Sequence, residues 1–424
     1  MSPQRKKRVG VVGLGYVGLP LAIRAAEVGY EVVGVDADAS RVACIRSGSS
    51  PIEDVSDDRL RTLLQAHRRL TVTDDYENLS AFDIAVITVP TPLKDRMPDL
   101  SYVEAATVSV APHVRPGCLV VLESTTYPGT TEELVAPLLA QGSGLRPGRD
   151  FHLGFSPERI DPGNLTWTLE TTPKVVSGMD DASLQAVTDF YADITDRCVQ
   201  VNSTRAAELA KLLENTFRHV NIALVNEMAM FARELDIDIW EVVEAAASKP
   251  FGFMKFLPGP GVGGHCLPID PAYLSWQVRR TTGRPFRFVE LACDINDHMP
   301  DYVVQRLTTE LNLRSLPVHG TKVLVLGLAY KANTGDARES PAVRIIALLQ
   351  KLGADVCVID PLVNPGHFPA GVIHAALDGE TLAGCDAAVL VTDHDCFDYG
   401  LVQRTVPLVL DCRHRMSGTR VVNL

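Results

Sequence analysis

The chain has 424 residues, a formal net charge of −12 and 46% hydrophobic residues. It is too long for one ordinary core, so we expect two or three domains. The negative charge argues against a nucleic-acid partner, because a polyanion is bound by a clustered positive field. A single diphosphate is still possible, since a few local cations and backbone amides suffice for it.

The basic opening segment runs directly into a strand-like apolar run, without the apolar stretch and cleavage site of a secretory signal. No stretch approaches the roughly 18 uncharged apolar residues that a membrane span needs. The nine cysteines are scattered without CxxC spacing. We therefore expect a soluble, cytoplasmic protein with free thiols, no metal site and no membrane partner.

The first 200 residues alternate between strand-like apolar runs and helix-length segments. The strand-like runs lie at 8–15, 30–38, 69–75, 83–92 and 119–125, and a helix-length segment follows the first of them at 21–29. Such alternation is typical of a parallel sheet with covering helices. We predict an α/β fold with a first domain over residues 1–202.

The start of this domain carries a Gly-rich turn. Gly13, Gly15 and Gly18 have GxGxxG spacing between a strand and a helix, and Asp36 ends the next strand. Glycines there allow a tight turn and close approach of a pyrophosphate, while the acid accepts hydrogen bonds from a ribose. A tight loop without a ligand is the alternative, but the full context favours an NAD site. Arg41 is within reach of a 2′-phosphate, yet Asp36 should repel one, which favours NAD over NADP.

The middle and last parts of the chain have different textures. Residues 203–234 have apolar side chains at helical spacing without Pro or Gly, which predicts a long helix with a kink or break and a central helical domain over 203–300. This helix offers a surface for a homodimer, or is buried against its own domains. Residues 318–424 return to strand–helix alternation, which predicts a second, smaller open sheet. It lacks GxGxxG, so no second dinucleotide is assigned to it.

The segment PGPGVGGHCLPIDP at 258–271 leaves the backbone bare around Cys266, so a ligand can approach both main chain and sulfur. Lys211 and Asn215 are four residues apart and share one face of the long helix. A nearby lysine lowers the pKa of a thiol and stabilises negative charge on a reacting oxygen. A structural glycine turn and a solvated lysine are the alternatives.

Several motifs in series resemble those of the UDP-glucose/GDP-mannose dehydrogenase family. They are VGVVGLGYVGLP, TVPTP, ESTTYPGTT, FSPERIDPGN, KLLENTFRHVNIALVNE, PGPGVGGHCLPIDP and LGLAYKANTGDARESPA, and together they cover residues 8 to 415. The resemblance implies two Rossmann-like open-sheet domains joined by a central long-helix region, with the last domain binding the UDP part of a nucleotide sugar. It also implies a four-electron oxidation of a sugar C6 alcohol to a uronic acid with two NAD, through a thiohemiacetal and a thioester on Cys266.

The resemblance assigns roles to individual residues. In catalysis it implies Cys266 as nucleophile, Lys211 and Asn215 as ligands of the reacting oxygen, Asp270 as activator of water, and Thr125 and Glu158 as groups that handle water and substrate. The cofactor contacts it implies are Gly13, Gly15, Tyr16, Val17, Gly18, Asp36, Arg41, Thr91, Thr126 and Arg338. The substrate contacts are Glu158, Arg159, Lys211, Asn215, Phe256, Gly259, Gly261, Gly263, Tyr330 and Lys331. His265 is not assigned as the base.

Two stretches bear on the sugar. SPERIDPGN resembles the branch that acts on UDP-N-acetylhexosamines, and KPFGFMKFLPGPGVGGHCLPIDP looks most like UDP-N-acetylglucosamine 6-dehydrogenases. We therefore expect UDP-N-acetylglucosamine, with UDP-glucose or dTDP-glucose as the alternative. A two-electron hydroxyacid-type dehydrogenase is a rival, but Cys266 and Asp270 are superfluous for it. A nucleotide-binding regulator without chemistry should have lost Cys266 or Lys211, and both remain.

Overall fold

The computed structural model describes residues 7–52, 55–94, 97–161, 164, 166–264 and 267–424. The chain divides into two compact units. The first contains residues up to 214 together with 272–282, and the second contains 215–271 and 283–424. The long helix that runs through residue 214 therefore contributes to both.

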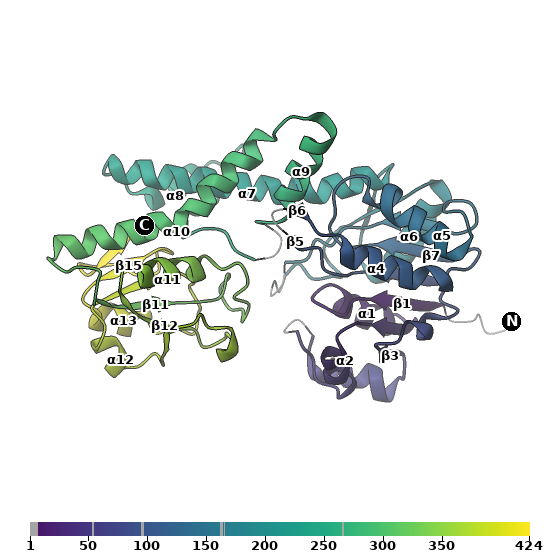
Figure 1. Cartoon of the computed structure of the whole chain (residues 1–424), viewed down its shortest axis with the longest axis horizontal. Coiled ribbons are helices and arrows are strands. Elements are labelled where there is room, and N and C mark those ends of the chain that lie inside the picture. The colour runs from purple at the N-terminus through teal and green to yellow at the C-terminus, as the bar shows by residue number, and fades with distance from the viewer. Residues whose placement is uncertain (1–6, 53–54, 95–96, 162–163, 165, 265–266) are drawn as a thin grey trace. The chain divides into compact units, whose positions relative to one another are not determined.

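The first unit is built on a sheet whose strands run parallel except at one pairing. Its order among the described residues is β10 (Cys198–Gln200), β9 (Lys174–Gly178), β8 (His152–Phe155), β7 (Leu119–Leu122), β4 (Ile84–Ile87), β1 (Arg8–Val12), β2 (Glu31–Val35) and β3 (Leu70–Thr73) (Figure 1). Only β8 and β9 pair antiparallel. A two-stranded hairpin of β5 (Leu93–Lys94) and β6 (Met97–Pro98) stands apart from the sheet.

The central strands are apolar throughout because helices cover the sheet. Every residue of β4 and β7 is buried. Helices α1 (Gly18–Glu27) and α6 (Asp181–Ile194) share one core, while α4 (Ser101–Val110) packs on α5 (Ala136–Ser143). The remaining elements of this unit are α2 (Ala39–Arg46), α3 (Asp57–Arg61), η1 (Thr62–Ala66), η2 (Tyr76–Leu79), η3 (Ala111–His113) and η4 (Thr131–Val135).

The predicted long helix is α7 (Thr204–Glu234), which runs unbroken for 31 residues. The expected break is wrong, and the absence of Pro and Gly over these residues explains the continuity. The helix that follows the glycine turn is α9 (Asp270–Thr282). Tyr273 on α9 donates to the carbonyl of Pro92 at 3.0 Å and Gln277 to that of Pro128 at 3.4 Å, so α9 is fastened to the first unit.

The second unit contains α8 (Ile239–Ala247), α10 (Arg287–Leu313) and a wholly parallel sheet. The strand order among the described residues is β13 (Ile373–His374), β12 (Asp355–Ile359), β11 (Lys322–Leu326), β14 (Ala387–Leu390), β15 (Val409–Asp411) and β16 (Val421–Asn423) (Figure 1). Its other elements are α11 (Pro341–Lys351), η5 (Pro365–His367), α12 (Gly379–Ala383) and α13 (Tyr399–Thr405). The order 3-2-1-4-5-6 is that of a Rossmann fold. The predicted α/β class with two Rossmann-like open sheets and a long-helix region is confirmed.

In the parts of the chain that the structure describes, no helix is long and apolar enough to cross a membrane. The eight described cysteines are free. No cluster of three metal-ligating side chains occurs among these residues.

Candidate active site

The Gly-rich turn after β1 has the geometry of a pyrophosphate site. Gly13 has φ +93°, and a Cβ on it would lie 2.7 Å from the carbonyl oxygen of Thr88. A Cβ on Gly18 would lie 1.8 Å from the carbonyl oxygen of Gly13, so both positions exclude side chains. At Gly15 a Cβ would meet nothing within 4 Å, which is the open space that a phosphate needs. The turn lies where the strand order reverses, between β1 and β4.

Asp36 lies directly after β2 and is fixed from three sides. Its Oδ2 accepts from the Leu14 amide at 2.7 Å and from Arg41 Nη1 at 2.9 Å, and its Oδ1 accepts from the Asp38 amide at 2.9 Å. Asp36 is buried, whereas Arg41 is partly exposed. The carboxylate therefore lies at the predicted ribose position and already neutralises Arg41.

The other expected cofactor residues lie at different places. Tyr16 is exposed, and Val17 precedes the first residue of α1. Thr91 is half-buried beyond β4, and Thr126 is fully buried with no partner for its hydroxyl among the described residues. Arg338 belongs to the second unit, where it pairs with Asp336 at 2.6 Å.

The ESTTYPGTT segment is anchored to α7 by Glu208, a residue that sequence reasoning missed. Its carboxylate accepts from the amides of Gly129 (2.6 Å) and Thr131 (2.9 Å) and from the Thr131 hydroxyl (2.7 Å). Burial raises the pKa of Glu208 to about 7. This anchor attaches the segment that carries Thr125 to the helix that carries Lys211. A carboxylate on the apolar face of a predicted helix was the available signal.

Lys211 and Asn215 are both buried on α7. Lys211 forms no hydrogen bond or ion pair with any described residue, which is unusual for a buried ammonium. In the second unit, Asn215 donates its side-chain amide to Asp270 Oδ2 and accepts from Arg218 Nη2 at 2.5 Å. Asp270 is itself buried. Cys266, four residues before Asp270, lies outside the described residues.

Glu158 of the SPER turn is held by its own backbone and by a lysine. Its Oε1 accepts from the amides of Arg159 (2.6 Å) and Ile160 (2.7 Å), and its Oε2 lies 2.9 Å from Lys174 Nζ. Arg159 turns instead to Glu214 on α7, with 2.8 Å between Nη2 and Oε1. Lys174 was missed because nothing in the sequence near it suggests a site.

The glycine turn is tied down within the second unit. The Gly259 amide donates to Asn226 Oδ1 at 2.9 Å, and Asn226 donates in turn to Asn296 Oδ1 at 2.9 Å. A Cβ on Gly263 would lie 2.8 Å from that of Tyr330, which brings the turn against the segment that also carries Lys331.

Other residues surround this turn. Gly261 has φ +130° and lies against Pro341, and Phe256 packs edge-on against Phe217 with ring centroids 5.9 Å apart. Arg413, which sequence reasoning missed, lies so close that a Cβ on Gly259 would come within 2.9 Å of its Nη1. Arg413 donates to the Val391 carbonyl but forms no ion pair with a described residue.

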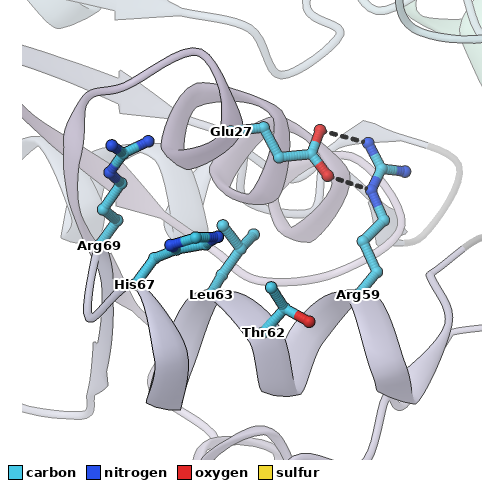
Figure 2. Close-up of a pocket in the computed structure, with 6 residues that line it drawn as sticks. All are labelled: Glu27, Arg59, Thr62, Leu63, His67 and Arg69. Carbon is cyan, nitrogen blue, oxygen red and sulfur yellow. Dashed lines mark hydrogen bonds and ion pairs between the residues drawn. The ribbon is translucent and has the colours of Figure 1, made fainter.

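A hollow beside α1 is a structural feature and not part of this site. Figure 2 shows Arg59 pointing at Glu27, to which it is joined by hydrogen bonds of 2.5 and 2.7 Å. The hollow is lined by Glu27, Arg59, Thr62, Leu63, His67 and Arg69. Its main charged groups pair with each other, so this ion pair ties α3 to α1.

The dinucleotide turn, the buried acid after β2 and a buried lysine that has no partner in the part of the chain the structure describes are features expected of an NAD-dependent dehydrogenase. The chain matches the NAD binding domain of the UDP-glucose/GDP-mannose dehydrogenase family over residues 7–195, its central domain over 205–298 and its UDP binding domain over 324–417. The chain belongs to this family, whose members are NAD-dependent nucleotide-sugar dehydrogenases.

Three of the proteins that this chain is similar to are named for different nucleotide sugars. The chain is 37% identical to UDP-N-acetyl-D-mannosamine dehydrogenase of Pyrococcus horikoshii, over 92% of this chain and 90% of that protein. It is 37% identical to UDP-N-acetyl-D-glucosamine 6-dehydrogenase of Pseudomonas aeruginosa, over 89% of this chain and 90% of that protein. A UDP-glucose dehydrogenase structure from Pyrobaculum islandicum matches with a TM-score of 0.88 and 29% identity, and the match covers 100% of this chain and 98% of that one. Several further relatives are named for UDP-N-acetyl-D-mannosamine.

Proposed function

We propose that this protein oxidises the C6 alcohol of a UDP-N-acetylhexosamine to the carboxylate, using two NAD and a covalent thioester on Cys266. The observation that carries the proposal is on α7. Lys211, a buried lysine that has no partner among the described residues, lies one turn before Asn215, which holds the carboxylate of Asp270. An ammonium, an amide and a carboxylate supply charge stabilisation, orientation and a proton acceptor, which this oxidation needs.

The proposed reaction has four steps. NAD, when bound, accepts a hydride in each of two oxidations. The alcohol loses a hydride from C6 and releases the proton of its hydroxyl to solvent to become an aldehyde, and Lys211 stabilises the negative charge on that oxygen. The Cys266 thiolate adds to the aldehyde carbon to give a thiohemiacetal, whose loss of a second hydride gives the thioester. Water, deprotonated by Asp270, attacks the thioester and releases the acid and the thiolate.

Thr126 supports this chemistry better than Thr125 does. The hydroxyl of Thr126 is fully buried and has no described partner, whereas Thr125 is half-buried. A buried hydroxyl without a partner carries a desolvation cost that a bound water or substrate oxygen removes. We therefore assign the water-handling role to Thr126.

The nucleotide part of the substrate is assigned to the second unit. Gly263 lies against Tyr330, which precedes Lys331, while Gly261 lies against Pro341. The guanidinium of Arg413, which forms no ion pair with a described residue, adds a positive charge beside Gly259. Cations and exposed amides are the groups that bind a diphosphate.

UDP-N-acetylglucosamine is the first candidate sugar, because SPERIDPGN and KPFGF favour it. UDP-N-acetylmannosamine is the second, because several similar relatives are named for it. UDP-glucose and dTDP-glucose remain the alternatives without an acetamido group.

NADH formation with a panel of UDP-N-acetylglucosamine, UDP-N-acetylmannosamine, UDP-N-acetylgalactosamine, UDP-glucose and dTDP-glucose tests the proposal. We expect an N-acetylhexosamine to give the highest kcat/KM and two NADH per acid formed. A clearly higher value with a hexose nucleotide would refute the sugar class. One NADH per product would refute the four-electron reaction.

We also propose that the protein is a homodimer that pairs through α7 and works in the cytoplasm, where a reduced Cys266 and NAD are available. A stripe of exposed apolar side chains follows one face of α7 at spacings of three, four and seven residues. The stripe consists of Leu209, Leu213, Phe217, Leu224, Met228 and Phe231 on α7 and continues to Leu235, the first residue after the helix. An exposed apolar stripe of this length indicates a protein contact.

Light scattering on the purified protein tests the dimer. We expect twice the 46.0 kDa chain mass, and a monomer for the double variant Leu213→Lys, Leu224→Lys. The matched control is Arg233→Ala, an exposed change on the same helix outside the stripe. A wild-type monomer at micromolar concentration would contradict the proposal.

A further inference from the structure

Two buried charged groups and one partly exposed carboxylate meet where strands of the first sheet end. Glu123 directly follows β7, Glu158 lies three residues beyond β8, and Lys174 begins β9. β9 runs antiparallel to β8, with Gly154 opposite Gly178. The first residue of β9 therefore lies beside the carboxyl ends of β7 and β8. The topology therefore brings together a residue of the ESTT segment, a residue of the SPER turn and a lysine.

The lysine is shared between the two carboxylates. Lys174 Nζ bonds Glu123 Oε1 and lies 2.9 Å from Glu158 Oε2. Glu123 Oε2 accepts from the hydroxyl of Tyr191 on α6 at 2.9 Å, and the ammonium lies 5.2 Å from the centre of the Tyr191 ring. Cys198, at the start of β10, is the other titratable group that Lys174 influences. We refer to Glu123, Glu158, Lys174 and Tyr191 as the lysine cluster.

Burial differs within the lysine cluster. The side chains of Glu123 and Lys174 are 0% and 3% exposed, whereas that of Glu158 is 13% exposed. Of the three charged members, Glu158 is thus the one with appreciable access to solvent or to a ligand. Two carboxylates and one ammonium leave one negative charge in excess, so a proton is favoured on one of the carboxylates.

The geometry decides which carboxylate that is. Burial raises the pKa of Glu123 to about 7, because its main compensations are Lys174 and one hydroxyl. Burial acts in the same direction on Glu158, but the Lys174 ammonium and the Ile160 amide outweigh it and lower the pKa of that carboxyl. As the pH falls through about 7 the proton therefore goes to Glu123, and Glu158 stays ionised.

We propose that Lys174 is a positioning residue for the dehydrogenase reaction, which holds the Glu158 carboxylate ionised and in place while the sealed Glu123 takes up the proton of the cluster. The inference rests on the proposed role of Glu158 in handling water and substrate. Lys174 contacts no reacting atom itself and acts through Glu158.

The pH dependence of kcat tests this. Without the ammonium in Lys174→Met, the two carboxylates compete and Glu158 is protonated at higher pH. We expect the acidic limb of the kcat profile to move to higher pH by about one unit, so that kcat at pH values below the limb falls about tenfold. Activity should recover at high pH, and KM for NAD should stay unchanged. Lys174→Arg keeps the charge and should keep the limb.

Removal of the competing acid supplies the control. Glu123→Gln should leave the acidic limb at the wild-type pH or move it to lower pH. The double variant Lys174→Met, Glu123→Gln removes one charge of each sign, so its acidic limb should return toward the wild-type pH. If Lys174→Met does not fold, the double variant and Glu123→Gln decide the question. Thermal unfolding followed by circular dichroism reports stability for each variant separately.

Two results separate this inference from the proposed function. The positioning role would be overturned by a Lys174→Met enzyme whose kcat is lower at every pH while the acidic limb stays at the wild-type pH. It would also be overturned if the acidic limb of the double variant lay at the same pH as that of Lys174→Met, or at a higher pH. Where Lys174→Met does not fold, a double variant with a raised limb would overturn it. Full activity in Glu158→Gln would instead refute the role of Glu158.

Discussion

Asn215 donates its side-chain amide to the carboxylate of Asp270, 55 residues further along the chain, and both side chains are buried. The same amide accepts from Arg218 through its oxygen, so its orientation is fixed. Because Asp270 begins α9 and follows the glycine turn of Cys266, the hydrogen bond sets where this carboxylate points. Asn215 is therefore expected to act on the acid as well as on the reacting oxygen.

Asn215→Ala should lower kcat by about 10²–10³, the usual effect of losing one hydrogen-bond donor aimed at developing charge. KM for the nucleotide sugar should change much less, because the nucleotide is assigned to other residues. Asn221→Ala is the matched control, since among the described residues the Asn221 side chain bonds only to the backbone of its own helix. A variant at position 215 with near-normal kcat would remove Asn215 from the reaction.

Asp36→Ala should weaken NAD binding by roughly 1.5–3 kcal/mol, the value of a hydrogen bond to a charged group. The change also releases Arg41 from its 2.9 Å pair, so the variant should gain activity with NADP. Asp38→Ala is the control, because Asp38 is exposed and caps α2. KM for both cofactors measures the effect. Equal turnover of the unchanged enzyme with NADP would contradict the role of Asp36.

His219 should make the second unit sensitive to acid. Burial lowers its pKa to about 4, and its Nε2 is buried without a described partner. The unfolded chain binds this proton near pH 6.5 but the folded chain does not, so the free energy of unfolding falls as the pH drops from about 7 toward 4. Between pH 8 and pH 5 the loss should be about 2 kcal/mol.

Urea unfolding of wild type and His219→Gln at both pH values measures this loss. The variant should lose about 2 kcal/mol less stability on acidification than the wild type does. His67→Gln, at an exposed histidine, should behave like the wild type. The same acid dependence in His219→Gln would show that other groups cause it.

The features that sequence reasoning predicted are local in the chain. The glycines of the turn, Asp36 behind the second strand and the spacing of Lys211 and Asn215 each depend on a known secondary structure and a short offset. The same holds for the alternating strands of both sheets, whose apolar runs match the observed strands.

The features that were missed depend on pairings between distant segments. Lys174 meets Glu158 only because β9 runs antiparallel to β8, whereas the sequence predicted a parallel sheet whose strand-like runs ended at residue 125. Glu208 meets residues 129–131 across more than 70 positions of the chain. Arg413 lies beside Gly259 because the second unit folds its last strands against the glycine turn. No local periodicity encodes such contacts, since each depends on where a distant segment of the chain folds.

Cys266→Ala should bind NAD and nucleotide sugar but form no acid. The glycine turn needs no side chain at that position, so binding measured by calorimetry should stay within about threefold of the wild type. Single-turnover assays should show at most the aldehyde. Near-normal acid production would remove covalent catalysis at Cys266, and the aldehyde would have to be oxidised as its hydrate.

Cys266→Ser should trap the covalent intermediate. A serine hydroxyl can add to the aldehyde, and loss of the second hydride then gives an ester in place of a thioester. An alkoxide is a poorer leaving group than a thiolate, so hydrolysis should be slow and the ester should accumulate. Intact-protein mass spectrometry after incubation with NAD and the preferred sugar should show a gain of one nucleotide sugar less four hydrogens.

Cys396→Ser, at an exposed free cysteine, should show no adduct and should keep its activity. An unmodified Cys266→Ser protein that stops at the aldehyde, with one NADH formed, would mean that the serine hydroxyl does not add to the aldehyde. An unmodified protein that turns over at the wild-type rate would show that no covalent step occurs at this position.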